Sequence, residues 1–245
     1  TNHYDAEAKA RIYPAYVKWC DFVGFDTYPI YGYNMPANLD HVATGTEQLV
    51  KLAGKGRPVY AWIETSKGSK WVAYDKQLDV KPKHTRAEVW MALIRGATGI
   101  GYFTHAWRPS YTQFRPDDEM IEELARLNAQ IRRLTPALLA EPAPGISIAL
   151  VDGEGATLNA HLKATEHEGA LYIFAQNIDL GAHADQLKQG DQITPRGGRA
   201  TIRVPGLKRG AQVAVVDEDR TITAEAGQIT DAFAPLAEHV YRVKR

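Results

Sequence analysis

The sequence has only one cysteine, Cys20, among its 245 residues. A single cysteine excludes an internal disulfide framework and a cysteine-rich metal site. It leaves the cellular compartment open, and a secreted or periplasmic location is among the alternatives because many secreted bacterial proteins lack disulfides.

The chain also lacks an excess of charge and any long apolar run. Lysine plus arginine and aspartate plus glutamate both total 29, so no overall field attracts nucleic acid or an anionic membrane surface. No apolar stretch approaches the roughly 20 residues of a membrane-spanning helix. We therefore expect neither nucleic acid nor a membrane among the partners.

Several local signatures of chemistry are missing as well. No serine occupies a Gly-x-Ser-x-Gly elbow, and the glycines of 96–101 precede a predicted strand, which argues against a phosphate-binding loop. No second histidine or cysteine stands at ligand spacing from His105. The sequence therefore predicts no metal and no cofactor.

Three apolar segments that end in polar or aromatic clusters are the main positive feature: 21–29, 58–65 and 99–107. Helical patterns precede, separate and follow them, at 5–18, 46–53, 85–96 and about 117–139. This order predicts parallel strands of an α/β barrel whose ends meet at one rim. A barrel needs eight strands, and only about three are visible.

The pattern changes after 142–145, where alternating apolar segments replace helices. Seven short segments are candidate strands, and they predict an antiparallel β-sandwich. We expect a catalytic half-barrel domain at 1–142 and an accessory sandwich domain at 146–245. The predicted strands are 147–151, 158–163, 171–177, 200–204, 212–216, 222–224 and 239–243.

Glu64 is the leading candidate for chemistry, because it ends an apolar strand at the rim where barrel active sites lie. Among aromatic neighbours its carboxylate could act as a nucleophile or proton shuttle in glycosidic bond cleavage. The alternative is an ordinary ion pair at a strand end. Asp26 ends the preceding strand and could share the acid and base roles, or form a turn.

Aromatic side chains near these carboxylates are candidate sugar-binding residues. Trp107 and His105 are two positions apart on one strand and so point the same way, and an indole face suits the C–H surface of a sugar ring. The alternative is that the tryptophan plugs the barrel and the histidine binds backbone. The full predicted substrate-binding set is Asp26, Tyr28, Trp62, His105 and Trp107.

These segments resemble the C-terminal half of clan A glycoside hydrolases, which are retaining (β/α)8-barrel enzymes. The matching motifs are Asp-Phe-Val-Gly-Phe-Asp-Thr-Tyr-Pro at 21–29, Ala-Trp-Ile-Glu-Thr at 61–65 and Gly-Ile-Gly-Tyr-Phe-Thr-His-Ala-Trp at 99–107, followed by a small β-domain. The resemblance implies strands six, seven and eight, a nucleophilic Glu64 and a sugar-stacking Trp107.

One element of the family is missing. Its acid/base glutamate belongs to an Asn-Glu pair, and no Asn-Glu occurs here. The resemblance therefore implies a proton donor outside this chain, supplied by an N-terminal half-barrel chain or by self-association. The leading hypothesis is a retaining hydrolase of oligosaccharides or polysaccharides. The alternatives are a non-catalytic carbohydrate-binding or assembly module, and an inverting enzyme that uses Asp26 with Glu64.

Overall fold

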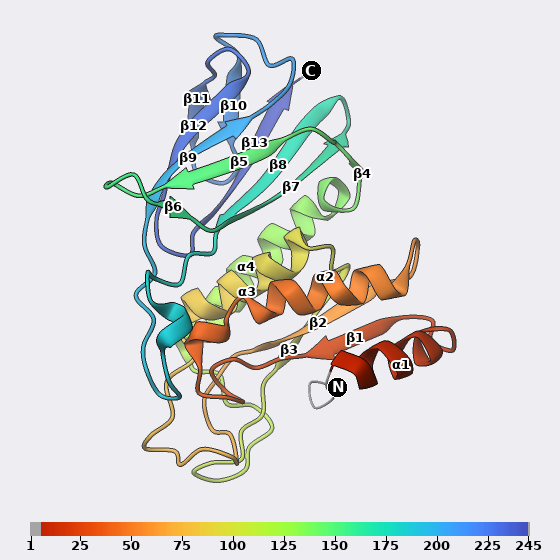
Figure 1. Cartoon of the computed structure of the whole chain (residues 1–245), viewed down its shortest axis with the longest axis vertical. Coiled ribbons are helices and arrows are strands. Elements are labelled where there is room, and N and C mark those ends of the chain that lie inside the picture. Colours follow the sequence, from red (N-terminus) through yellow and green to blue (C-terminus); the bar gives the residue numbers. More distant parts are fainter. Residues whose placement is uncertain (1–5, 245) are drawn as a thin grey trace. The chain divides into compact units, whose positions relative to one another are not determined.

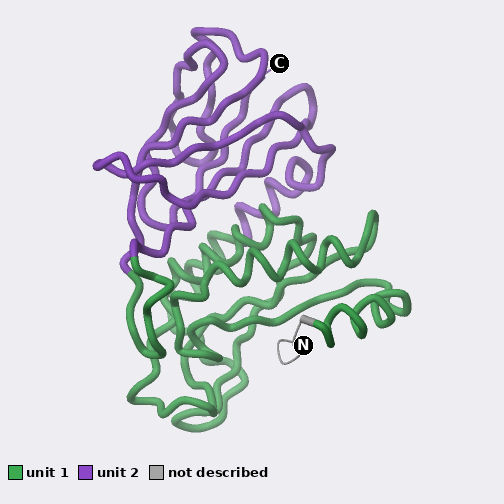
Figure 2. Tube along the Cα trace, in the orientation of Figure 1, with its two compact units in different colours: residues 1–127, 183–193 green, residues 128–182, 194–245 purple. Residues whose placement is uncertain are grey.

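A computed structural model describes residues 6–244 of the chain. These residues form two compact units, 6–127 with 183–193 and 128–182 with 194–244 (Figure 2). The boundary falls within helix α4 (Asp118–Leu138). The domain boundary expected at 142–146 stays a prediction.

The first unit contains an open, three-stranded parallel sheet of β1 (Val23–Asp26), β2 (Val59–Glu64) and β3 (Gly99–Phe103), in that order. Helices α2 (His41–Ala53) and α3 (Pro82–Ile94) cover one face (Figure 1). The unit also contains helix α1 (Ala6–Val17), two short helices, η1 (Pro36–Asn38) and η2 (Ala184–Gln186), and the start of α4. The prediction of successive parallel strands is confirmed.

The two faces of β2 differ because side chains alternate along a strand. Val59, Ala61 and Ile63 are buried, whereas Tyr60 and Trp62 are 37% and 46% exposed. Gly99 and Gly101 lie opposite these two aromatic residues on β3. A Cβ atom on either glycine would come within 2.4 Å of the facing ring, so the large side chains of β2 require glycines on β3.

Helix α3 begins earlier than the sequence suggests. Lys81 is its N-cap residue, and its backbone N–H donates to Nδ1 of His84. Thr85 and Glu88 have the spacing of a capping box, which predicts that the helix begins at Thr85. Both residues instead lie inside the helix and are fully buried. That prediction is wrong, because the hydroxyl of Thr85 instead donates to the carbonyl oxygen of Glu64 at 2.9 Å.

The second unit contains two antiparallel sheets that share one hydrophobic core. The order is β11-β10-β13-β8-β7-β4 in one sheet and β12-β9-β5-β6 in the other. The chain is thus a mixed α/β protein, as expected. The strands are β4 (Glu141–Pro142), β5 (Ser147–Val151), β6 (Thr157–Leu158), β7 (Ala160–His167), β8 (Ala170–Asn177), β9 (Gly198–Arg203), β10 (Gln212–Val215), β11 (Arg220–Thr223), β12 (Gln228–Phe233) and β13 (Glu238–Lys244).

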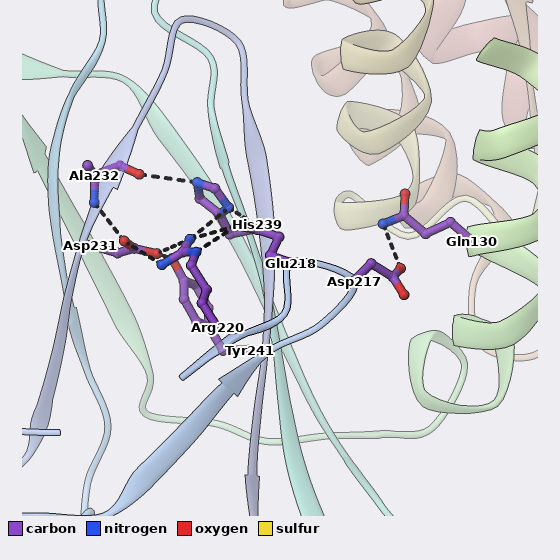
Figure 3. Close-up of polar contacts among 8 residues, drawn as sticks. All are labelled: Gln130, Asp217, Glu218, Arg220, Asp231, Ala232, His239 and Tyr241. Atoms are coloured by element: carbon purple, nitrogen blue, oxygen red, sulfur yellow. Dashed lines mark hydrogen bonds and ion pairs between the residues drawn. The ribbon is translucent and has the colours of Figure 1, made fainter. Parts of the chain in front are cut away.

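Strand β12 is the longest strand that the sequence analysis missed. Its residues Ile229 and Phe233 are buried, but Asp231 lies between them on the same face and interrupts the apolar alternation. The structure compensates this carboxylate with Arg220 on β11 and Tyr241 on β13, as Figure 3 shows.

These contacts join the two sheets. Arg220 donates Nη1 and Nη2 to the two oxygens of Asp231, at 2.9 and 2.8 Å, and the Tyr241 hydroxyl adds a bond of 2.8 Å. Burial alone would raise the pKa of Asp231, but the bonds from Arg220 and Tyr241 outweigh burial and lower it. Arg220 also bonds Glu218, which contacts Nδ1 of His239. This polar cluster therefore has a structural role.

Candidate functional site

Glu64 is the last residue of β2 and has no exposed surface, whereas Trp62 two residues earlier is half exposed. The segment that follows β1 covers its carboxylate. Oε1 accepts the backbone N–H of Ile30 at 2.9 Å, and Oε2 accepts that of Tyr31 at 2.6 Å. Two amide donors favour the ionised carboxylate, and the same bonds anchor the segment to the end of the sheet.

A second carboxyl group, Glu88 of α3, is buried beside Glu64. Burial raises the pKa of Glu88 well above its ordinary value, and the charge of Glu64 raises it further. Burial also raises the pKa of Glu64 to about 7, against the opposing interactions with Glu88, Ile30 and Tyr31. Two adjacent buried carboxylates cannot both ionise cheaply, so the pair favours a state in which at least one of the two is protonated.

The sequence analysis missed Glu88 as a member of this site. A usable signal was present, because this acid stands in a helix whose next six residues, 89–94, are buried and apolar. Its position three residues after Thr85 suggested a capping box instead. Only the packing of α3 against β2 reveals its partner.

Asp26 and Tyr28 lie close to this pair. Asp26 is opposite Trp62 in the β1–β2 register, two positions before Glu64 along β2. Burial raises the pKa of Tyr28 far above its ordinary value, followed by the charges of Asp26 and Glu64. The phenol therefore lies within electrostatic reach of both carboxylates.

A row of aromatic rings continues from Tyr28 along the end of β3. Ring centroids are 4.5 Å apart for Tyr28 and Phe103, 4.1 Å for Phe103 and His105, and 5.5 Å for His105 and Trp107. Tyr111 extends the row, 5.1 Å from Trp107. The sequence analysis identified three of these five residues and missed Phe103 and Tyr111.

The outer end of this row is accessible, since Trp107 is 42% exposed and Tyr111 is 57% exposed. Trp62 is half exposed on the open face of β2, where its ring packs over Gly101. The structure thus places Tyr28, His105 and Trp107 in one row of rings, with Phe103 between Tyr28 and His105, whereas Trp62 lies on the sheet itself. Their roles in binding stay predictions.

Within residues 6–244, no three His, Cys, Asp or Glu side chains are grouped so that they could hold a metal ion. In the same part of the chain, no helix is long and apolar enough to span a membrane.

No family model and no curated protein matches the sequence. Solved structures do match. The α-amylase of Geobacillus thermoleovorans, complexed with acarbose, superimposes with a TM-score of 0.53 and 13% identity, over 91% of this chain and 48% of the amylase. The chain shares its fold with glycoside hydrolases. The resemblance is therefore confirmed at the level of the fold.

Two further structures have lower scores. A putative α-galactosidase/melibiase of Bacteroides fragilis gives a TM-score of 0.49 at 10% identity, over 90% of this chain and 42% of the other. A GH30 endoxylanase of Clostridium papyrosolvens gives 0.41 at 11% identity, over 91% and 49%. The chain spans about half the length of the structures it matches.

Proposed function

We propose that the chain is the C-terminal portion of a retaining O-glycoside hydrolase that acts on an oligosaccharide or polysaccharide. In this proposal β1, β2 and β3 are strands six to eight of a (β/α)8 barrel, and the two antiparallel sheets form the accessory β-sandwich. One observation carries it: carboxylates and an aromatic row gather at the carboxyl ends of adjacent parallel strands, where barrel enzymes have their active sites.

Glu64 is the nucleophile in this mechanism. Its carboxylate forms a bond to the anomeric carbon while the glycosidic oxygen departs with a proton from an acid outside this chain. Water then attacks the anomeric carbon, the ester bond breaks, and the same acid/base residue accepts the proton of that water. Tyr28, His105 and Trp107 hold the sugar, with Asp26 and Trp62 beside it.

The geometry sets a condition on this mechanism. Both oxygens of Glu64 are bound by backbone amides and have no exposed surface. Attack therefore requires the segment that contains Ile30 and Tyr31 to move when substrate binds. Gln77 holds that segment, because its Nε2 donates to the carbonyl oxygen of Tyr31 at 2.8 Å.

The test replaces Glu64 in the complete protein. Glu64→Ala should lower turnover of an aryl glycoside by at least about 10³-fold, and added azide should restore release of the aryl group with a glycosyl azide of inverted configuration. Glu122→Gln, on the exposed face of α4, is the control. Near-normal turnover by Glu64→Ala would remove Glu64 as nucleophile. A first product of inverted configuration would instead support an Asp26 and Glu64 pair.

The burial of Glu64 favours a second candidate, a non-catalytic carbohydrate-binding or assembly module. Here Glu64 only anchors the segment after β1, and the exposed Trp107 and Tyr111 supply binding. Calorimetry would then detect glycan binding that survives Glu64→Gln, while no reducing sugar is released at any pH. Hydrolysis that disappears with Glu64→Ala and returns with azide would exclude this candidate.

Under either candidate function, one edge of the parallel sheet still lacks a pairing strand in the part of the chain that the structure describes. Within the described residues β1 pairs with β2 only, so its other edge is open. An apolar cavity of about 610 Å³ beside it is lined by α1, α2 and β1, and Trp19 nearby in sequence is 89% exposed. We expect an N-terminal half-barrel or a second copy at this edge. The mass of the native particle tests this, and a monomer without additional chain would contradict it.

A further inference from the structure

Two loops at the carboxyl ends of β2 and β3, 65–81 and 104–117, form one continuous surface, which we call the rim surface. They lie side by side in Figure 1. The carbonyl oxygen of Gly68 accepts the backbone N–H groups of Trp107 and Arg108, at 2.7 and 3.0 Å. Gly68 has a φ of 125°, and a Cβ there would come within 2.6 Å of Ala106. The loops are therefore fixed against each other.

The rim surface is basic although the whole chain is neutral. The two loops contain six lysines and arginines and three aspartates, in a chain with 29 of each sign. Two of the aspartates are already engaged. Asp79 pairs with Lys67 at 2.8 Å and Lys81 at 3.3 Å, and Asp117 accepts the N–H of Met120 at the start of α4.

Three of the cations, Lys70, Arg108 and Arg115, have no carboxylate partner among residues 6–244. Arg108 donates to the carbonyl oxygen of Lys70 at 2.9 Å, and Arg115 donates to the hydroxyl of Tyr74 at 2.8 Å. These neutral contacts orient both guanidinium groups and leave their charge available to an anion.

Lys70 is held between two aromatic rings. Its ammonium nitrogen lies 5.2 Å from the ring centroid of Trp71 and 5.4 Å from that of Trp107. The rings themselves are accessible, since Trp71 is 65% exposed and Tyr111 and Phe114 are both 57% exposed. Positive charge and flat apolar surface therefore alternate along the rim.

A cavity of about 430 Å³ continues this surface, within the range of about 300–1,000 Å³ that ligand pockets occupy. Lys67, Tyr74 and Arg115 line it, and so does Ser66, which is 9% exposed and whose Oγ has no hydrogen-bond partner in the described part of the chain. Asp79, Asp117 and Glu119 also line it, and the first two are engaged as described above.

We propose that the rim surface binds an anionic glycan, whose acidic groups pair with Lys70, Arg108 and Arg115 while its sugar rings stack on the exposed aromatic residues. The inference deepens the proposed function, because it names the substrate class of the same rim. A neutral glycan would use the rings alone and would leave three cations without a role.

Single-stranded nucleic acid is also anionic and stacks on aromatic rings. The site argues against it, because Asp26 and Glu64 end two neighbouring strands and their carboxyl groups disfavour a continuous phosphodiester backbone there. The chain also has no net positive charge. An acidic glycan avoids repulsion from Asp26 and Glu64 when its charged groups face the rim cations and an uncharged part of the sugar lies near the carboxyl groups.

The test is calorimetry with the complete protein and three hexasaccharides of equal length: hexagalacturonate, a sulfated maltohexaose and unmodified maltohexaose. We expect an acidic hexasaccharide to bind about 30-fold more tightly than the neutral one at low salt, since three exposed pairs contribute about threefold each. The difference should shrink as salt rises. The preferred acidic ligand tells whether carboxylate or sulfate is recognised.

Variants separate charge from stacking. Lys70→Gln, Arg108→Gln and Arg115→Gln should each weaken acidic binding about threefold and leave neutral binding unchanged. Trp71→Ala should weaken both, and Lys208→Gln, an exposed control in the second unit, should change neither.

Equal binding of acidic and neutral hexasaccharides, or tighter binding of an oligothymidylate, would overturn the inference. Hydrolysis that Glu64→Ala abolishes, combined with equal binding of acidic and neutral hexasaccharides, would leave the proposed function standing while removing this one. Conversely, tight binding of hexagalacturonate without any hydrolysis would support anionic glycan binding at the rim surface and contradict the proposed hydrolase activity.

Discussion

Two carboxyl groups buried side by side make the stability of the first unit depend on pH. Glu64 and Glu88 have no exposed surface, and burial raises the pKa of both. Glu88→Gln keeps the size of the side chain and removes one ionisable group. Its amide can donate to the Glu64 carboxylate, which already accepts the amides of Ile30 and Tyr31.

The sign follows from proton linkage. A carboxyl group whose pKa is higher in the folded state stabilises the protein fully below its unfolded pKa, and this contribution is lost as pH rises through the folded pKa. For Glu64 the rise from 4.5 to about 7 corresponds to about 3 kcal/mol, at about 1.4 kcal/mol for each pKa step. The wild-type protein should lose this amount between pH 4.5 and pH 7.

Urea unfolding at pH 5, 6 and 7 measures the effect. We expect Glu88→Gln to flatten the pH dependence and to unfold at higher urea concentration than the wild type at pH 7, with the two proteins converging near pH 4.5. Glu122→Gln, an exposed acid on α4, controls for the loss of a charge. Parallel slopes for wild type and Glu88→Gln would refute the coupling of the two buried carboxyl groups.

Three other changes test the packing. Arg220→Met should destabilise the second unit by about 2 kcal/mol in urea unfolding, because it leaves Asp231 without its charged partner; an unchanged midpoint would contradict the inter-sheet role. Gly101→Ala should cost about 1–3 kcal/mol and shift tryptophan fluorescence, since a Cβ meets the ring of Trp62 at 2.4 Å; unaltered emission would show that the contact is absent. Gln77→Leu should destabilise by about 2–4 kcal/mol, because it leaves the backbone groups that Gln77 binds without partners, and hydrogen exchange at the amide of Tyr31 should rise in parallel.

The strands and helices of the first unit could be predicted because their signals are local. The apolar run of 59–63 and the helical spacing of apolar residues within 118–138 indicate which positions are buried, and both patterns can be read from nearby residues. The same signals located Glu64 and Asp26 at strand ends, which the parallel register confirms. The prediction that His105 and Trp107 lie on the third strand is wrong, because β3 ends at Phe103 and both residues belong to the loop that follows. Strand β12 was not predicted, because Asp231 occupies an inward position and interrupts the apolar alternation. Arg220, which balances the charge of Asp231, lies on another strand, so no local pattern reveals the pair.

The sequence by itself determined the order of strands and helices in the first unit and the aromatic composition of the rim, because the periodicity that marks each element depends on neighbours a few residues apart. Tertiary structure alone decided that Ile30 and Tyr31 enclose Glu64, that Glu88 lies against it, and that the two rim loops join through Gly68. These contacts join residues that are 24 to 40 positions apart in the chain, where side-chain periodicity carries no information and only the packing of helices and loops on the sheet fixes which groups meet.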